Sequence, residues 1–137
     1  MKDVKFESHK DEVLKAMKEQ VQFGLDLIGE EAEGYAKKKC PVDTGRLRNS
    51  ITHATKSNGS NRIHRYKDDN GKTFSQHVGQ VTDEMTLVIG TNVVYAIQQE
   101  TNDNLKHEKG QQAHFLRDSV TQHHDRYKKI MKTVLSD

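Results

Sequence analysis

Apolar residues in the first third of the chain recur three or four positions apart. This spacing places them on one face of an α-helix. Acidic residues lie toward the start of the segment and Lys37, Lys38 and Lys39 at its end, an arrangement that the helix dipole favours. We therefore expect one long helix over 8–39. The apolar positions are Leu14, Met17, Val21, Leu25, Ile28, Ala32 and Tyr35.

The predicted helix is longer than a small domain is wide, at roughly 45 Å for a rise of about 1.5 Å per residue. Part of it should project or pack on a neighbouring molecule. Gly24, Gly29 and Gly34 lower its helix propensity, so a bend or the close approach of another segment is expected at these positions.

Residues 40–50 are predicted to form an elbow. Pro41, the only proline, ends the helix because the residue before a proline disfavours the α conformation. Asp43 and Thr44 can cap a short helical turn, and Gly45 permits a left-handed backbone. We expect the leucine of this turn to contact the core and its two arginines to remain available outside. These residues are Leu47, Arg46 and Arg48.

The pattern changes to a strand-like one after the elbow. Residues 51–55 alternate as a strand does, and a second strand at 85–89 ends at Gly90. Between them, the polar segment 56–82 carries two Asn-Gly turn signals and predicts a long, mobile hairpin or loop. A short helix or turn is expected near 98–100, an exposed loop over 101–111, and an amphipathic helix over 112–135.

These elements define an α+β fold. At 137 residues the chain is expected to form a single domain over 1–137. In it, a small antiparallel sheet of about four strands, formed within 51–100, packs against the long N-terminal helix and the C-terminal helix.

Composition indicates a thin core. Apolar residues make up 32% of the chain, charged residues 31%, and there is no tryptophan. The isolated subunit should therefore depend on partners for part of its stability. The net charge of +2 hides four alternating blocks of −4 over 1–36, +8 over 37–67, −5 over 68–105 and +3 over 106–137. Such blocks suit head-to-tail packing of copies into a homo-oligomer.

The basic block over 37–67 can also be interpreted in two other ways. It can be plain solvated surface or a contact with the backbone of a nucleic acid, although no recognition-length helix carries a basic stripe. The possible interface or DNA-facing residues are Lys37, Lys38, Lys39, Arg46, Arg48, Lys56, Arg62, Arg65 and Lys67.

The sequence contains no complete catalytic motif. Gly71-Lys72-Thr73 looks like the end of a phosphate-binding loop, but Tyr66 stands where its first glycine is needed. The eight histidines include no metal-binding spacing, so we expect no cofactor and no metal. Cys40, the only cysteine, has no adjacent base and is expected to be structural. The carboxylates of Glu30, Glu31 and Glu33 are interpreted as the solvated side of the helix.

Targeting signals and membrane spans are not expected. No stretch approaches about 18 consecutive apolar residues, and the N-terminal residues lack the apolar run of a signal peptide. The sequence therefore predicts a protein made and kept in the cytosol, without contact with a membrane.

The run CPVDTGRLRNSI closely resembles the signature of the gene-product-ten-like family of tailed phages. Two further blocks resemble the same family, VIGTNVVYAIQQE and AHFLRDS. The chain departs from the family pattern at two positions. Thr101 follows Glu100 directly, where the family often has a run that contains glycine, and His114 stands where proline is usual. The matching residues are Pro41, Val42, Asp43, Thr44, Gly45, Arg46, Leu47, Arg48, Ser50, Ile51, Gly90, Tyr95, Ala96, Glu100, Phe115 and Leu116.

This resemblance implies a non-enzymatic structural subunit of a phage virion. It would act in head-tail joining or tail completion, as a ring through which DNA passes. Its partners would be other copies of the chain and the neck, connector and tail proteins. It would be located at the neck or the head-proximal end of the tail, and in the host cytoplasm during assembly. The alternative from the residues alone is a small nucleic-acid-binding protein.

Overall fold

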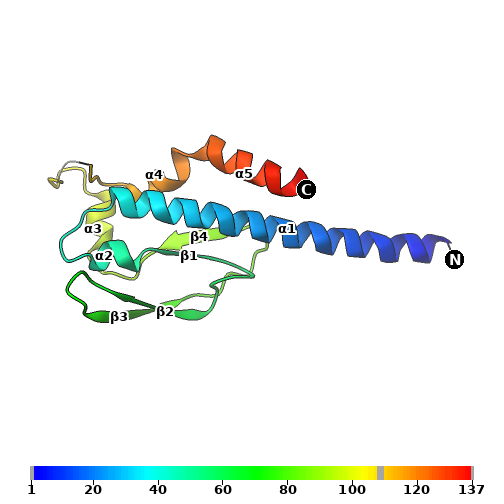
Figure 1. Cartoon of the computed structure of the whole chain (residues 1–137), viewed down its shortest axis with the longest axis horizontal. Coiled ribbons are helices and arrows are strands. Elements are labelled where there is room, and N and C mark those ends of the chain that lie inside the picture. The colour runs from blue at the N-terminus through cyan, green and yellow to red at the C-terminus, as the bar shows by residue number, and fades with distance from the viewer. Residues whose placement is uncertain (1, 108–109, 137) are drawn as a thin grey trace.

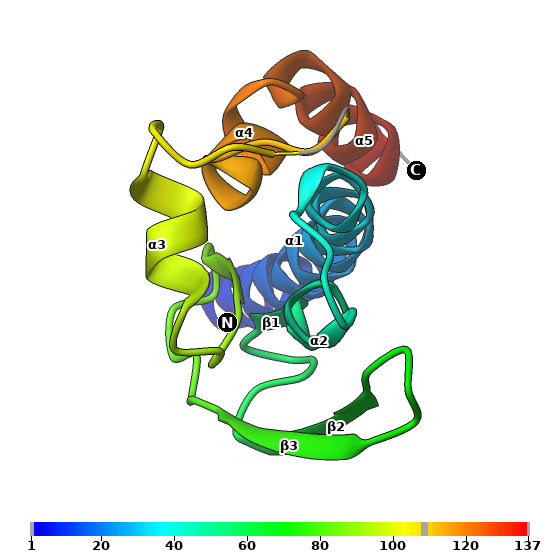
Figure 2. The same cartoon turned by 90° about the vertical axis from the view of Figure 1, so that its left-hand side faces the viewer.

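One long helix, α1 (Lys2–Lys39), forms the axis of the computed structural model, which describes residues 2–107 and 110–136 (Figure 1). Two helices at the C-terminal end of the chain, α4 (Phe115–Thr121) and α5 (His124–Ser136), lie along one side of α1. The strands and the short helix α2 (Arg46–Ser50) lie on its other side (Figure 2). Helix α1 is therefore covered on two sides over its C-terminal half, while its N-terminal part projects.

Close approaches of other segments explain two of the three glycines in α1. A Cβ atom on Gly24 would lie 2.7 Å from Met131 Sδ of α5, and one on Gly29 would overlap the ring of His53. Gly34 has no other atom within 4 Å of that position. The expected close approach is thus confirmed at Gly24 and Gly29, where the missing side chain lets α5 and the first strand reach the helix axis.

The described residues contain four strands, paired as two separate two-stranded antiparallel sheets. β1 (Thr52–Thr55) pairs with β4 (Leu87–Gly90), in a register that places Thr52 opposite Gly90. β2 (Arg62–Lys67) and β3 (Thr73–Val78) form the hairpin predicted within 56–82. The α+β class and the four antiparallel strands are confirmed. The expectation of one sheet was wrong, since the strands divide into two sheets, and alternation along a strand does not identify its neighbours.

Two helices replace the single helix expected over 112–135. The chain breaks at residues 122–123, where the ring of His123 stacks on Tyr35 of α1 with centroids 3.5 Å apart. The Tyr127 hydroxyl of α5 donates a hydrogen bond back to the Ser119 carbonyl of α4. The prediction of one continuous helix was wrong, because these contacts hold α4 and α5 at a bend that their helical spacing does not reveal.

The other helix bounds differ less from expectation. Helix α1 begins at Lys2 rather than at residue 8. The short helix α3 (Ala96–Thr101) includes the predicted segment 98–100. Within the described ranges, no helix is long and apolar enough to cross a membrane.

Candidate functional site

The three sequence blocks meet in one buried cluster. Leu47 and Ile51 of the first block, Ala96 of the second and Phe115 of the third are each no more than 5% exposed. The full cluster is Ala36, Cys40, Leu47, Ile51, Val93, Ala96 and Phe115. Segments far apart along the chain therefore bury their apolar positions against the end of α1, and the prediction that Leu47 contacts the core is confirmed.

The turn from α1 into α2 depends on the backbone of the elbow. Helix α1 makes its last hydrogen bond from Cys40 N to the Ala36 carbonyl, immediately before Pro41. Thr44 Oγ1 accepts a hydrogen bond from Arg46 N, two residues further on, at 3.3 Å, so it satisfies one free N–H group as expected. The N-cap of α2 is Gly45, however, and not Asp43 or Thr44. Gly45 has φ +82°, a conformation that favours glycine, and any side chain here would overlap the Asp69 carboxylate. The predicted left-handed glycine is confirmed. Asp43 and Val42 complete the elbow, with Val42 N donating to Gln111 Oε1.

A buried polar network joins the elbow to the hairpin. Ser50 is fully buried, and its hydroxyl bonds the Leu47 carbonyl at 2.6 Å and the Thr91 hydroxyl. Gln76 of β3, 5% exposed, donates to the Ser50 carbonyl at 2.7 Å and accepts from Asn92 N at 2.8 Å. Because a buried polar group is costly without partners, these reciprocal bonds fix the two sheets relative to the elbow.

Sequence reasoning missed Gln76. Its one available signal was the alternation along β3, which places it on the same face as Phe74 and Val78. The alternation thus indicates which face Gln76 is on, but not that its side chain bonds Ser50 and Asn92.

The two arginines of the elbow hold the hairpin in place. The Arg46 guanidinium carbon lies 4.2 Å from the centroid of the Phe74 ring, and Arg48 Nη2 lies 2.5 Å from Asp69 Oδ1. Asn49 Nδ2 donates to the Lys67 carbonyl at 2.7 Å. The expectation that Arg46 and Arg48 remain available outside was therefore wrong, because the hairpin returns to the elbow and engages both side chains.

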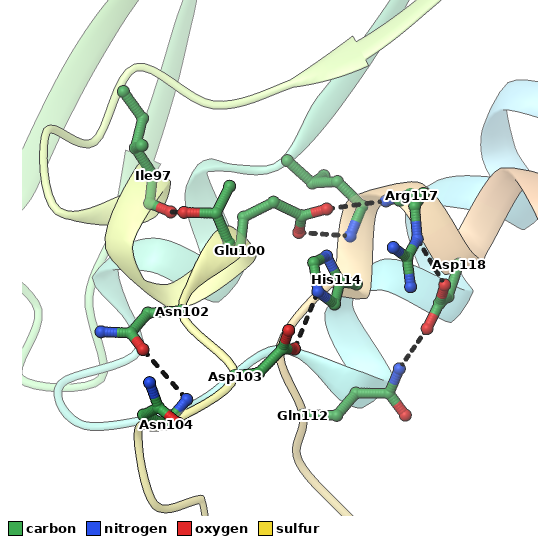
Figure 3. A network of polar contacts seen from close by, with 11 residues as sticks. Ile97, Glu100, Asn102, Asp103, Asn104, Gln112, His114, Arg117 and Asp118 are labelled. Atoms are coloured by element: carbon green, nitrogen blue, oxygen red, sulfur yellow. Dashed lines mark hydrogen bonds and ion pairs between the residues drawn. The ribbon is translucent and has the colours of Figure 1, made fainter.

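Glu100 joins the second sequence block to the third (Figure 3). Its two carboxylate oxygens accept hydrogen bonds from the first turn of α4, from Leu116 N at 2.9 Å and Arg117 N at 3.0 Å. A carboxylate is favourable here, because the first backbone N–H groups of a helix have no partner within the helix and carry partial positive charge.

His114 gives the same junction its shape. It has φ +58°, its backbone N–H donates to the Glu100 carbonyl at 2.7 Å, and its Nε2 lies 2.8 Å from Asp103 Oδ1. Proline could not reach this φ, and it has no backbone N–H to donate the hydrogen bond. The departure from the family pattern at position 114 thus has a structural correlate, a left-handed residue that starts α4.

The remaining block residues lie at the edges of the cluster. Gly90 ends β4, and Leu116 packs against the cluster as a partly buried residue. Tyr95 is 43% exposed at the start of α3, and partial burial raises the pKa of its hydroxyl.

The nine basic residues do not converge on one surface. Three are paired with carboxylates within the chain, Lys37 with Glu33, Arg48 with Asp69 and Lys56 with Glu84. Arg46 packs on Phe74, and Arg62 donates to the Thr52 hydroxyl. Lys38 and Lys39 are exposed at the end of α1, and Arg65 and Lys67 on the outer face of β2.

Two glutamates of α1 are paired with side chains of other elements. Glu31 forms two hydrogen bonds with Arg126 of α5, and these lower the pKa of its carboxyl group. Glu33 Oε1 lies 2.9 Å from His53 Nδ1 of β1. Burial by itself would raise the pKa of Glu33, but the hydrogen bond to His53 and the charge of Lys37 leave it below its usual value. The interpretation as a solvated side was wrong for Glu33, which the first strand covers, whereas Glu31 stays partly exposed in its pair with Arg126.

The arrangement offers little for catalysis. Cys40 is fully buried, and burial raises the pKa of its thiol to about 12, so it is protonated at neutral pH. Among the described residues, no group of three or more His, Cys, Asp and Glu side chains is placed to hold a metal ion. The blocks together form a packed junction between helices and sheets.

The fold and the buried cluster define a junction between helices and sheets that is built from the sequence blocks. Residues 4–101 match the family described as "Bacteriophage HK97-gp10, putative tail-component", which covers well over half of the chain. The protein belongs to this family of phage tail components, and the resemblance is confirmed for the first two sequence blocks, while the third lies outside the matched residues. A search of curated proteins finds no match, and a search of solved structures finds none either.

Proposed function

We propose that the protein is a structural subunit that acts in head-tail joining or tail completion. In this proposal, copies of the chain form a ring at the neck or the head-proximal end of the tail, and DNA passes through the ring. The family match over 4–101 carries the proposal, since it indicates a structural component of the virion that contacts other tail proteins.

The surface supports assembly with other proteins. Several large apolar side chains lie outside the core, among them Val94 at 89% exposed and Ile97 at 72%. Both belong to the second sequence block, next to the partly exposed Tyr95. Exposed apolar side chains that gather in one segment are typical of surfaces that contact a partner. A subunit that buries such surface on assembly also gains stability from it.

The role is proposed to be non-enzymatic, without a cofactor. The sequence blocks place their residues in packing, capping and backbone turns, and the one thiol is buried and protonated. The alternative of a dedicated nucleic-acid-binding protein gains no support from the basic residues, because five of the nine are engaged by groups of their own chain. Proximity to DNA in the ring would then be non-specific.

Deletion of the gene from the phage that encodes it tests this proposal. We expect filled heads and tails that remain separate or unstable, with infectivity restored by the wild-type gene supplied in trans. A Leu47→Asp variant, which places a charge in the buried cluster, should fail to restore infectivity, whereas Lys128→Asp at an exposed position of α5 should succeed. Joined, infective particles from the deletion strain would contradict the proposal.

Location provides the second measurement. Antibody-gold labelling of wild-type particles in the electron microscope should mark the junction of head and tail. Labelling confined to the distal tail or the head shell would exclude the neck position and leave only the family-level role.

A further inference from the structure

The N-terminal part of α1 extends past every other element of the chain (Figure 1). The last residues of α1 that contact the strand side are Lys18, paired with Glu84, and Gln22, which bonds the Glu84 carbonyl and Ser57 N. On the other side, Met131 and Val134 of α5 lie against Gly24, and Val134 also borders a groove with Ala16, Glu19, Gln20 and Phe23. The side chains of residues 9–19 are all exposed. A helical segment as short as residues 9–19 is only marginally stable in water by itself, so contact with a partner would stabilise it.

One face of this projecting segment is apolar. Val13 and Met17 are four residues apart and share a face, and Leu14 lies beside them. Met17 is 51% exposed. It precedes Gly24 by seven residues, which puts it on the face that α5 covers further along the helix. We name Val13, Leu14 and Met17 the overhang strip. It continues an interior face of the subunit beyond the point where the chain can cover it.

A second apolar surface lies at the base of the projection. Phe23 is 59% exposed and lines a groove with Ala16, Glu19, Gln20 and Val134 of α5. We name this the Phe23 groove. At about 100° per residue, Phe23 lies about 120° around the helix from Met17. Met17 and Phe23 therefore face different directions and can contact two different molecules, while Val13 lies in line with Gln20 at the edge of the groove.

We propose that the overhang strip of one copy packs into the Phe23 groove of the next copy. This inference rests on the proposed function and identifies the surfaces that would join its subunits. The contact is heterologous, since each copy keeps a free groove at one side and a free strip at the other. Contacts of this type repeat from copy to copy and close into rings when the rotation allows.

Charge favours a second copy as the occupant. Residues 9–19 carry three lysines and three acidic residues, Lys10, Lys15, Lys18, Asp11, Glu12 and Glu19, with no net charge. A nucleic-acid surface or a membrane-bound helix requires an excess of cations. A strongly charged partner would require a net charge of opposite sign. A second copy brings the same balanced charges together with the apolar groove that the strip requires.

Two glutamate substitutions separate the two surfaces. Met17→Glu disrupts only the strip, and Phe23→Glu disrupts only the groove. Both side chains are exposed, so circular dichroism should show unchanged helix content. We expect wild-type protein to associate by light scattering as its concentration rises, and each variant alone to remain monomeric. An equimolar mixture of the two should form dimers and nothing larger, because only one pair of intact surfaces remains. Val120→Glu, a similar change at an exposed position of α4, should associate like the wild type.

The outcomes distinguish this inference from the proposed function. Wild-type protein that stays monomeric up to about 1 mM overturns the inference, as does a Met17→Glu variant that associates normally. A mixture without dimers overturns the heterologous contact. None of these results changes the gene-deletion experiment, which decides the proposed function separately.

Disulfide trapping gives an independent measurement on the full chain. In a Met17→Cys/Phe23→Cys variant the two thiols lie six residues apart on one helix, about 9 Å along its axis, too far to join within a chain. The native Cys40 is buried and should not compete. Mild oxidation should yield a ladder of covalent multimers, and neither single variant should do so. Asp11→Cys/Phe23→Cys is the control. If it yields as large a fraction of covalent multimers as Met17→Cys/Phe23→Cys, the inference is overturned.

Discussion

Glu100 Oε2 accepts a hydrogen bond from Leu116 N at 2.9 Å, and through this contact the end of α3 determines where α4 begins. The second carboxylate oxygen accepts from Arg117 N. A side chain sixteen residues upstream thus provides the cap that the sequence next to α4 does not. No capping hydrogen bond comes from the side chain of His114, the residue immediately before the helix.

Replacement of Glu100 should therefore destabilise the protein. Glu100→Ala removes both acceptors, and we expect the free energy of unfolding to fall by about 1–2 kcal/mol. Glu100→Gln keeps one acceptor oxygen and should lose about half as much. Urea denaturation followed by circular dichroism measures both values. Gln98→Ala, exposed on the same helix, is the control, and equal effects of Glu100→Ala and Gln98→Ala would show that the cap contributes nothing.

Proline at position 114 should be poorly tolerated, although the family usually has proline there. His114→Pro forces φ away from +58° and removes the donor to the Glu100 carbonyl, so a loss of roughly 2–3 kcal/mol is expected. His114→Gly keeps both the conformation and the donor and should lose less than about 1 kcal/mol. Thermal unfolding of the two variants tests this difference. Similar midpoints for both would mean that the left-handed conformation is not required.

Gly45 and Gly34 should respond to alanine in opposite ways. Gly45→Ala places a side chain on a backbone with φ +82° and against Asp69, so we expect a loss of about 1–2 kcal/mol or more. Gly34→Ala fills open space on α1 and should raise stability by up to about 1 kcal/mol. The midpoints of urea unfolding report both effects. In an Asp69→Ala background, which lacks both the steric overlap and the ion pair with Arg48, Gly45→Ala should cost only the conformational part.

The Glu33 carboxylate should make stability depend on pH in the acid range. Its pKa in the folded protein lies below the ordinary value of 4.5, so its ionised form is stabilised by folding. Its contribution is complete above about pH 4.5 and is lost as the pH falls through the lowered pKa. Glu33→Gln should cost about 1 kcal/mol at pH 7 and much less at pH 3. Glu30→Gln, at an exposed position, should behave like the wild type at both values. A loss for Glu33→Gln that is equal at pH 7 and pH 3 would exclude the ionised pair as its cause.

Elements with a strong local pattern could be predicted from sequence. The helical spacing of apolar residues predicted α1, and the single proline predicted its end at the elbow. The Asn-Gly signals predicted the hairpin, and residue chemistry alone predicted the left-handed Gly45. Each of these features depends on neighbours within a few positions, where backbone sterics and periodicity decide the outcome.

Contacts between distant segments could not be predicted in this way. The inward position of Gln76, the engagement of Arg46 and Arg48 by the hairpin, and the cap from Glu100 to α4 all join residues at least sixteen positions apart. The bend between α4 and α5 likewise depends on Tyr35, far back in α1. Periodicity identifies the face of an element but not the element that packs on it.

By itself the sequence determined the α+β class, the elbow, the thin core and the family to which the chain belongs, because composition, local spacing and the three blocks are properties of the chain in order. Only the tertiary structure decided that the blocks meet in one core, that most of the basic block is engaged within the chain, and that the N-terminal part of α1 stays uncovered. The physical reason is that burial and pairing depend on which surfaces meet in space, and these surfaces come from segments that the sequence keeps far apart.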